Sequence, residues 1–465
     1  MPVTGIFPSP HTCHRRLRTM DGRHRSAHYS SNEELRAVSE RHVIKSMGDE
    51  PLAIASASGV RVTGADGREY LDVISGEWVV NLGYSHPKVS EAVKAQLDTA
   101  DYTTPVWESE PRTLLAERLA NLAPGDIQSA LFGLSGAGAV EGAMHLAMRS
   151  TGGSDFVCLD GGYHGRTFGT IPLSYVYPEM YEGSNQGLDG YLKRQIRVPQ
   201  YNCYRCPLSL QRETCDLACA NSIDWSLERA HTHKPAGVIV ESFQANGGMI
   251  PAPLGYMERT AEICKQREVA LIVDEVQSAF CRTGPMFASE HYDIEPDIVV
   301  LGKALGGGFP LSAALATPEY STLAPWEFGF TMAGHPVSCA AGLAMIDVME
   351  SDDLMNHSTR MGELIVDRLN VIKESSTLIG DVRGQGLMIG VELVQNRQTK
   401  EPAFAETAAV LEAALERGLM LGRTGPVFGN LGNVVKFKPA VNTAQADLED
   451  ALDRFESALQ EVEGS

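Results

Sequence analysis

Two apolar runs in the chain end in residues that can do chemistry. Residues 270–273 lead directly into Asp274, and residues 298–301 are followed, after Gly302, by Lys303. Buried strands that end in this way place polar side chains at the carboxyl edge of an α/β sheet, where ligands bind. Loss of hydration there lowers the pKa of a lysine and makes its neutral amine nucleophilic. The alternative is a structural lysine paired with Asp274 or Glu275.

Two further segments add a place for a phosphate and an aromatic plane. Residues 134–139 are a turn of small residues from a predicted strand into a predicted helix, and free amides at such a helix start suit a phosphate. Tyr163 and His164 follow the end of another predicted strand. A phosphate cradle, an aromatic ring, a buried acid and an activated lysine are together the protein parts of a pyridoxal phosphate (PLP) site.

The elements that must position these residues follow from the hydrophobic pattern. Helical periodicity covers 139–149 and 256–266, and the predicted buried strands lie at 130–134, 156–159, 237–240, 269–273, 298–301 and 312–316. Near-continuously apolar strands separated by helices indicate a parallel sheet that is covered on both faces. The predicted fold class is therefore α/β.

The order of elements along the chain also predicts its domains. Residues 1–30 contain five arginines between 11 and 30 and are expected to form a flexible basic arm. Residues 31–80 and 341–465 are expected to form the N-terminal and C-terminal parts of a small α+β domain. Residues 81–340 are expected to form the large domain, with a cysteine-rich insertion at about 200–222.

Composition limits the classes of function. The 465 residues include 39 Lys and Arg against 59 Asp and Glu, a net charge of −20, which argues against nucleic-acid binding. No run of 18 apolar residues occurs, so no membrane span is expected. Nine cysteines are too few for a disulfide scaffold, which favours a cytoplasmic protein.

The motifs resemble those of the class III (subgroup II) PLP-dependent aminotransferases of fold type I. The resemblance runs from about residue 40 to the C-terminus and is densest at 240–253, 271–284, Lys303 and 334–341. It implies a large domain with a mostly parallel, seven-stranded sheet flanked by helices, beside a smaller α+β domain. It also implies PLP as the cofactor.

The resemblance further implies a role for each matching residue. Lys303 is the Schiff-base and proton-shuttling lysine, and Asp274 pairs with the protonated ring nitrogen. The other implied cofactor contacts are Gln277 on the phenolic oxygen, Tyr163 and Val276 on the two faces of the ring, Gly136 and Ala137 on the phosphate, and Thr331 on the phosphate of a second subunit. The role of Thr331 implies at least a homodimer with shared active sites.

The chain departs from the family where substrates are recognised. Typical members hold carboxylates with an arginine in an Arg-x-x-Pro-Pro segment, whereas here Lys436 begins the matching text, and lysine cannot make the same two-pronged contact. Asn246 replaces a glutamate that swings between partners in many members. Glu77 resembles a position that holds glutamine in the dialkylglycine decarboxylase branch, and its charge repels a carboxylate and favours a cation. The residues expected near the substrate are Glu77, Trp78, His164 and Lys436.

These departures predict a substrate that is a cationic amine or an aminosugar and not an α-amino acid, as in family members of aminoglycoside antibiotic pathways. The alternative for Glu77 is a structural role, as a cap or a partner of an arginine. Transamination is the predicted reaction because it dominates the family. A lyase, dehydratase or epimerase is the close alternative, since it needs only one substrate and tolerates Lys436.

Two other patterns carry alternative readings. Cys203, Cys206, Cys215 and Cys219 have a spacing compatible with a structural zinc site, but free thiols or a disulfide rank ahead of it, and no metal is assigned. The glycines at 133, 136 and 138, with Asp160, distantly resemble a nucleotide-binding dehydrogenase. That reading leaves Asp274, Gln277 and Lys303 unexplained.

Overall fold

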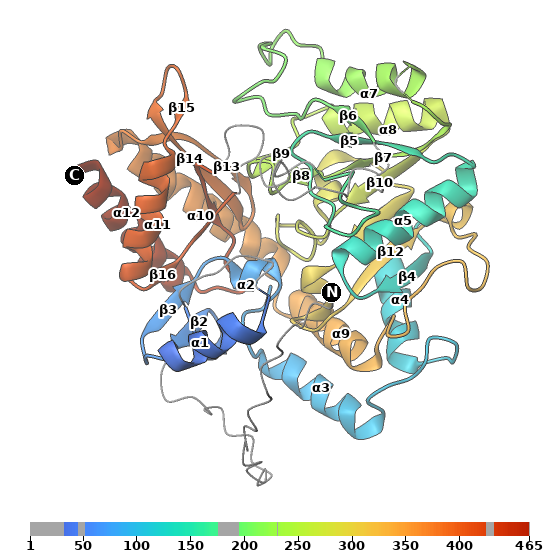
Figure 1. Cartoon of the computed structure of the whole chain (residues 1–465), viewed down its shortest axis with the longest axis horizontal. Coiled ribbons are helices and arrows are strands. Elements are labelled where there is room, and N and C mark those ends of the chain that lie inside the picture. The colour runs from blue at the N-terminus through green and yellow to red at the C-terminus, as the bar shows by residue number, and fades with distance from the viewer. Residues whose placement is uncertain (1–31, 45–51, 175–194, 230, 425–431, 465) are drawn as a thin grey trace, which may run out of the picture.

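The computed structural model describes residues 32–44, 52–174, 195–229, 231–424 and 432–464 (Figure 1). Its central element is a seven-stranded sheet with the order β4-β12-β11-β10-β7-β5-β6. In chain order these strands are β4 (Ser129–Gly133), β5 (Asp155–Leu159), β6 (Ile196–Val198), β7 (Pro235–Val240), β10 (Ala270–Asp274), β11 (Ile298–Leu301) and β12 (Ser312–Ala316).

The sheet is parallel except for β12, which pairs antiparallel with β11 and with β4. Because β12 runs against both neighbours, β4 points the same way as β11. The carboxyl ends of β4, β11, β10, β7 and β5 therefore meet at one edge of the sheet. The predicted α/β class with a mostly parallel sheet is confirmed. The apolar pattern predicted neither the reversed direction of β12 nor the edge strand β6.

Side chains alternate across the sheet and bury its two faces against different helices. In β10, Ile272 belongs to the core on the α5 side, whereas Leu271 and Val273 belong to the core formed with α7 and α8. Helices α4 and α9 cover the β4–β11 end of the latter face. The bounds are α3 (Pro87–Thr99), α4 (Glu110–Leu122), α5 (Gly136–Thr151), α7 (Ala218–Arg229), α8 (Tyr256–Arg267) and α9 (Pro336–Ser351).

Two smaller sheets and the remaining helices lie beside the large sheet (Figure 1). One sheet has the order β1-β2-β3-β16, and the other the order β13-β14-β18-β17 with β15 paired to β14. Their strands are β1 (Ile54–Ser58), β2 (Arg61–Gly64), β3 (Glu69–Asp72), β13 (Ile379–Gln385), β14 (Met388–Asn396), β15 (Glu401–Pro402), β16 (Leu419–Met420), β17 (Gly422–Arg423) and β18 (Val434–Phe437). The associated helices are α1 (Asn32–His42), α2 (Ser75–Trp78), α10 (Leu354–Ser375), α11 (Phe404–Glu416) and α12 (Gln445–Gly464).

The parallel pairing of β3 with β16 joins an N-terminal segment to a C-terminal one, as a small domain made of both chain ends requires. The predicted boundary between residues 340 and 341 falls inside α9, and the domain division stays a prediction. The predicted arm at 1–30 lies outside the described residues. Short elements complete the fold, namely β8 (Phe243–Gln244), β9 (Ile250–Pro251) and the 3-10 helices η1 (Ala288–Tyr292), η2 (Lys303–Gly306) and η3 (Pro318–Tyr320).

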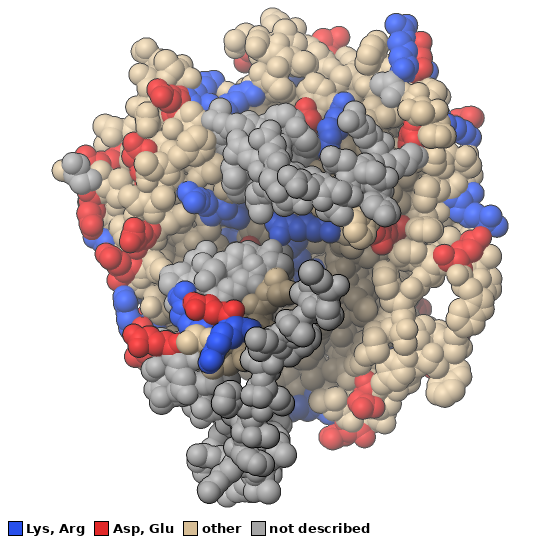
Figure 2. Space-filling model, in the orientation of Figure 1, with Lys and Arg blue, Asp and Glu red and all other residues tan. Residues whose placement is uncertain are grey.

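The distribution of charged side chains and the polarity of the helices can be compared with the expectations from composition. On the face that Figure 2 shows, the described acidic and basic side chains are interspersed and form no continuous basic patch. Within the described ranges, no helix is both long and apolar enough to cross a membrane.

Candidate active site

Five strand ends bring the predicted chemical groups to one edge of the large sheet. Asp274 is the last residue of β10, Lys303 comes two residues after β11, and Glu241 directly follows β7. Tyr163 follows β5, and the loop after β4 leads into the first turn of α5. This convergence follows from the parallel strand directions, because the carboxyl ends of neighbouring parallel strands share an edge.

Asp274 is buried and hydrogen-bonded on both oxygens. Its Oδ2 lies 2.8 Å from Nδ1 of the buried His164, and its Oδ1 accepts a hydrogen bond of 3.0 Å from the backbone N–H of Val276. These contacts fix the direction of the carboxylate. The structure thus puts His164, expected near the substrate, in direct contact with the acid, where it can hold Asp274 in position.

Lys303 begins η2 with a positive φ of 43°. Such a backbone conformation is unfavourable for a residue with a side chain and persists where surrounding structure enforces it, often at functional sites. Desolvation of the ammonium lowers the pKa of Lys303, while the charges of Asp274, Glu241 and Glu77 oppose the shift. A lowered pKa increases the fraction of neutral, nucleophilic amine.

The first turn of α5 contains small residues, so its backbone N–H groups are not covered by bulky side chains. Ser135 caps the helix, since its Oγ accepts a hydrogen bond from the N–H of Gly138. The N–H groups of Gly136 and Ala137 belong to the first turn, where a helix supplies no partner for them. A Cβ at Gly136 would lie 2.9 Å from Cγ1 of Val276, so a side chain there would collide with its neighbour.

Trp78 lies among three lysines. Two of them, Lys303 and Lys436, were predicted site residues, and the third, Lys438, was not. The Nζ atoms of Lys303, Lys436 and Lys438 lie 5.6, 4.3 and 4.2 Å from a ring centre of the Trp78 indole. Lys438 is fully buried, and its Nζ lies 3.4 Å from Oε1 of Gln277. A lysine at this distance can orient the amide of Gln277.

Burial and crowding lower the pKa values of both C-terminal lysines. Desolvation, together with the charge of Lys303, lowers the pKa of Lys436 to about 8, against the opposing effect of Glu77. The pKa of Lys438 is lowered well below its ordinary value by desolvation and then by Arg282, Lys303 and Lys436.

Glu77 and Lys436 line the same cavity, which has a volume of about 520 Å³. Its other lining residues come mainly from α11, β16 and β17. Glu77 is exposed, and within the described part of the chain it forms no ion pair with an arginine. The cavity therefore carries charges of both signs.

The turn that holds Glu77 and Trp78 has an unusual backbone. All four residues from Ser75 to Trp78 have positive φ values of 44–70°. Left-handed turns cost roughly 1–2 kcal/mol per residue for residues other than glycine. Asp72 stabilises the turn by accepting hydrogen bonds from the N–H groups of Ile74 and Gly76 at 2.7 and 2.8 Å.

A buried arginine ties this turn to the rest of the site. Arg282 is fully buried and donates to Ser75 Oγ at 3.1 Å and to Asn81 Oδ1 at 2.7 Å. Ser75 in turn donates to the carbonyl of Lys438 at 2.9 Å. Arg282 thereby links α2 with the segment that carries the two C-terminal lysines.

Sequence reasoning gave no role to Lys438, Glu241 or Arg282. Lys438 stands two positions after Lys436. Because side chains two positions apart in an extended segment point to the same side, this spacing could have indicated that Lys438 lies beside Lys436. Glu241 accepts hydrogen bonds from the N–H groups of Tyr163 and Ala245 at 3.0 and 3.1 Å, and desolvation raises its pKa to about 7.

Thr331 is exposed, and its carbonyl accepts a hydrogen bond of 3.0 Å from the hydroxyl of Tyr102. The contact to a second subunit that the sequence resemblance implies for Thr331 stays a prediction.

The two residues predicted to contact the faces of the cofactor ring have different surroundings. Val276 is partly buried beside Gly136. The guanidinium of Arg166 lies 5.8 Å from the centre of the Tyr163 ring.

The four cysteines of the insertion line one small cavity between residue 200 and α7. All four are free thiols, and among the described residues no three His, Cys, Asp or Glu side chains have an arrangement that could hold a metal ion. Zinc therefore stays unassigned.

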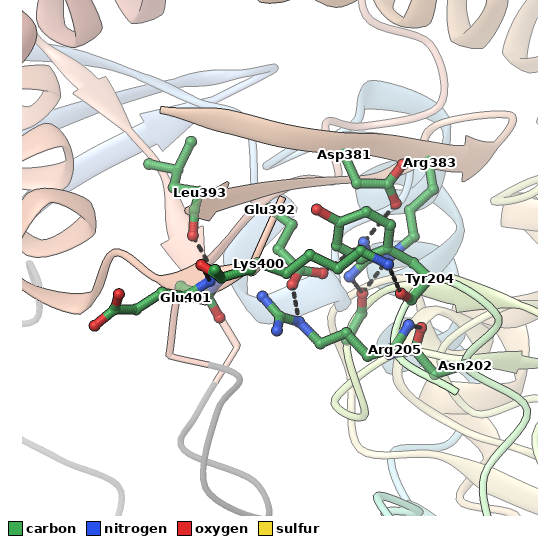
Figure 3. Close-up of polar contacts among 12 residues, drawn as sticks. Asn202, Tyr204, Arg205, Asp381, Arg383, Glu392, Leu393, Lys400 and Glu401 are labelled. Carbon is green, nitrogen blue, oxygen red and sulfur yellow. Dashed lines mark hydrogen bonds and ion pairs between the residues drawn. The ribbon is translucent and has the colours of Figure 1, made fainter. Parts of the chain in front are cut away.

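The cysteine-rich segment is fixed to β14 by charged side chains, as Figure 3 shows. Arg205 and Arg383 both form ion pairs with Glu392, which is fully buried, and the Arg383 contact measures 2.8 Å. Lys400 donates to the carbonyl of Tyr204 at 2.6 Å. These contacts hold the insertion against the smaller part of the molecule.

The residues at the sheet edge fit PLP. The turn at Gly136 and Ala137 is free of bulky side chains, the acid at Asp274 is buried and oriented, and Lys303 is a desolvated amine. The indole Nε1 of Trp78 is a buried donor without a partner among the described residues, as expected beside a group that accepts hydrogen bonds.

Comparisons with known proteins identify the family. Residues 44–459 match the model of the family "Aminotransferase class-III". The leucine/methionine racemase of Thermococcus litoralis is 35% identical over 417 residues, which cover 89% of this chain and 91% of that protein. The diaminobutyrate–2-oxoglutarate aminotransferase of Haemophilus influenzae is 33% identical over 88% of this chain and 90% of its own length.

A solved structure agrees in fold and in cofactor. An amine transaminase from an uncultivated Pseudomonas species, solved in its PLP-bound form, is 27% identical with a TM-score of 0.83. The match covers 90% of this chain and 98% of that one. This protein therefore belongs to the class III aminotransferases, and its cofactor is pyridoxal 5′-phosphate.

Proposed function

We propose that the protein transfers an amino group from a cationic amine to a 2-oxo acid. The observation that carries this proposal is the gathering of Glu77, Lys436 and Lys438 around Trp78. A transaminase must bind two different partners in turn. A carboxylate for the cationic partner and two amines for the anionic partner meet that need in one site.

The proposed roles of the cofactor-binding residues follow their positions. Gly136 and Ala137 would bind the phosphate through backbone N–H groups, Tyr163 and Val276 would contact the ring, and Gln277 would hydrogen-bond its phenolic oxygen. Asp274, oriented by His164, would keep the ring nitrogen protonated. PLP, when bound, supplies an electron sink that allows a bond at the amine-bearing carbon to break.

Lys303 carries out the proton movements in this scheme. With PLP bound, its amine would hold the cofactor and would serve as the base at the substrate carbon. Desolvation favours the neutral form of the amine that both tasks need. Glu77 orients the amine substrate by attracting its second positive charge.

The names of relatives support a substrate whose reacting amine is remote from any carboxylate. The relative from Haemophilus influenzae acts on diaminobutyrate, and a relative from Escherichia coli, 32% identical over 93% of this chain, is a 4-aminobutyrate aminotransferase. A diamine or diamino acid combines such an amine with the second charge that Glu77 favours. An aminosugar, as in aminoglycoside pathways, is the variant of this class that the sequence also favours.

A racemase or epimerase is the second candidate. The named racemase from Thermococcus litoralis is 35% identical to this chain, and a one-substrate reaction needs no oxo acid. A lyase or dehydratase also needs only one substrate, but no contact among the described residues favours either reaction.

The proposed assembly is a homodimer with shared active sites. Trp107 and Trp326 are 68% and 90% exposed, and Val106 and Phe168 are also exposed. Large apolar side chains that gather on a surface are typical of an interface with another protein, and we propose that these side chains face the second subunit. Thr331 would then contact the phosphate in the partner's site. The cytoplasmic location expected from the sequence stays a prediction.

The experiment is an incubation of the purified holoenzyme with 2,4-diaminobutyrate, putrescine or 4-aminobutyrate, each with 2-oxoglutarate. Formation of glutamate supports the proposal. Exchange of the substrate α-hydrogen with deuterated water, with inversion of configuration and no glutamate, favours the racemase instead.

A further inference from the structure

Another cavity, with a volume of about 630 Å³, lies between the cysteine-rich segment and the turn that joins β14 to β15. Its walls are formed mainly by residues between 200 and 211, together with Thr399 and Lys400 from that turn and Asp160 after β5. Small-molecule sites have volumes of about 300–1,000 Å³, so this cavity is large enough for a metabolite. Its described lining residues include none of those predicted to contact the cofactor or the substrate.

The wall of this cavity holds an amide donor without a partner. Asn202 is 2% exposed and lines the cavity. Its Oδ1 accepts a hydrogen bond of 3.0 Å from the N–H of Arg205, whereas its Nδ2 has no acceptor among the described residues. Buried donors in native proteins are normally paired, so this amide requires an acceptor that the described part of the chain does not supply.

Two cations, Arg205 and Lys400, line the same cavity and are drawn in Figure 3. Nε of Arg205 is bound to Glu392, but its Nη2 is buried and has no partner among the described residues. Nζ of Lys400 donates to the carbonyl of Tyr204 at 2.6 Å and lies 4.4 Å from the centre of the Tyr204 ring. An ammonium has three N–H groups, so Lys400 can donate to a ligand as well.

The charges around this wall do not balance. Arg205 and Arg383 share the buried carboxylate of Glu392, and Arg383 also pairs with Asp381 at 2.7 Å. With Lys400 included, three cations are gathered around two carboxylates. An excess of positive charge at a cavity wall favours an anionic ligand.

We propose that this cavity binds the phosphate group of a small phosphorylated metabolite. Asn202 Nδ2, Arg205 Nη2 and Lys400 Nζ donate one hydrogen bond to each of the three terminal oxygens of the phosphate. A carboxylate has only two oxygens and carries less charge, so it matches three donors less well. Because Lys400 lies in the turn after β14 and the other two donors lie in the cysteine-rich segment, the bound phosphate joins these two parts of the fold.

The remaining walls suit the rest of such a molecule. Pro207 and Leu210 supply apolar surface, and Thr399 supplies a hydroxyl group. Asp160 is the acidic residue among the described lining residues. Desolvation raises the pKa of Asp160, and the positive charge of Arg197 opposes that shift. Asp160 therefore has a cation of its own and does not cancel the charge of the donors.

The test is a calorimetric titration of the holoenzyme with inorganic phosphate and with glycerol 3-phosphate. The holoenzyme is used because its PLP already occupies the phosphate-binding turn at the start of α5. Acetate is the carboxylate for comparison. We expect both phosphates to bind saturably and acetate to bind at least about tenfold more weakly, as the loss of a charged hydrogen bond predicts.

Variants place the bound anion in this cavity. Lys400→Met should weaken binding of both phosphates by about tenfold or more, because it removes a charged donor. Asn202→Asp keeps an oxygen that accepts the N–H of Arg205 but replaces the free amide N–H groups with a negatively charged oxygen, so it should also weaken binding by about tenfold or more. Lys265→Met, at an exposed position of α8 that does not line the cavity, should leave binding unchanged.

Absence of saturable phosphate binding by the wild-type protein would overturn the proposal, as would wild-type affinity in both Lys400→Met and Asn202→Asp. Phosphate binding that is lost in Lys436→Met but kept in Lys400→Met would place the anion in the active site and would overturn it as well. Acetate that binds as tightly as phosphate would contradict the choice of ligand. Because the wild-type titrations need no variant, a folding defect in a variant does not remove the test.

Discussion

The imidazole of His164 lies directly against the carboxylate of Asp274, with 2.8 Å between Nδ1 and Oδ2, and both side chains are buried. This contact fixes the direction of the acid that, in the proposed function, pairs with the ring nitrogen of the cofactor. A hydrogen bond to a charged group contributes about 1.5–3 kcal/mol. The contribution of this hydrogen bond to catalysis can be tested by replacing the imidazole with an aromatic ring that has no nitrogen atoms.

We expect His164→Phe to lower kcat by about 10- to 100-fold, which is that free energy expressed as a rate. The visible absorption of the bound cofactor should change as well, because Asp274 no longer holds one orientation. His231→Phe, at an exposed position outside the site, is the control. An unchanged spectrum and kcat in His164→Phe would remove His164 from this role.

Lys436 should lower the stability of the folded apoprotein. The fall of its pKa from 10.5 to about 8 corresponds to about 3 kcal/mol. Since the folded-state pKa lies below the unfolded value, this penalty is complete below pH 8 and disappears as the pH rises to 10.5. We therefore expect Lys436→Met to raise the free energy of unfolding at pH 7 by about 1–3 kcal/mol.

Urea unfolding of the apoprotein at several pH values measures this effect. The advantage of Lys436→Met should shrink between pH 8 and pH 10.5. If the methionine variant were less stable than the wild type at pH 7, burial of the charged Lys436 would not lower the stability of the fold.

Glu77 should favour substrates with a second positive charge. We expect Glu77→Gln to raise KM for putrescine by about five- to tenfold, the effect of losing about 1 kcal/mol of charge attraction. KM for 4-aminobutyrate, which has no second cation, should change little. Steady-state kinetics with both amines decide the point, and a larger loss with 4-aminobutyrate would contradict it.

The buried carboxylate of Glu392 should be among the most sensitive positions for stability. It pairs with Arg205 and Arg383, and removal of one member of a buried ion network leaves uncompensated charge that costs about 3–5 kcal/mol. We expect Glu392→Ala to lower the free energy of unfolding by that amount. Glu461→Ala, which breaks an exposed pair with Arg417, should cost less than about 1 kcal/mol. Similar losses in the two variants would show that burial does not decide the effect.

The elements that carry the chemistry were predictable because they follow a simple physical rule. An apolar strand that ends in Asp274 or Lys303 must deliver that side chain to the carboxyl edge of a parallel sheet. The strands at 298–301 and 312–316 were predicted with the same bounds that the structure has. The direction of β12 was not predictable, because an apolar run reads the same in both directions.

The substrate side of the site depends on features that sequence patterns do not express. The turn with positive φ values at Ser75, Glu77 and Trp78 is held by the neighbouring Asp72 and by Arg282, which lies 207 positions after Ser75. Lys436 had suggested a weakened carboxylate site. The structure adds a second lysine, Lys438, next to the same indole ring, so two amines lie where the sequence had suggested one.

The most direct test of the account is reduction of the holoenzyme with borohydride, followed by a peptide map. The account predicts that the cofactor becomes permanently attached to the peptide that contains Lys303 and that the visible absorption of the protein is lost. A label on Lys436, Lys438 or any other lysine, or no label at all, would contradict it.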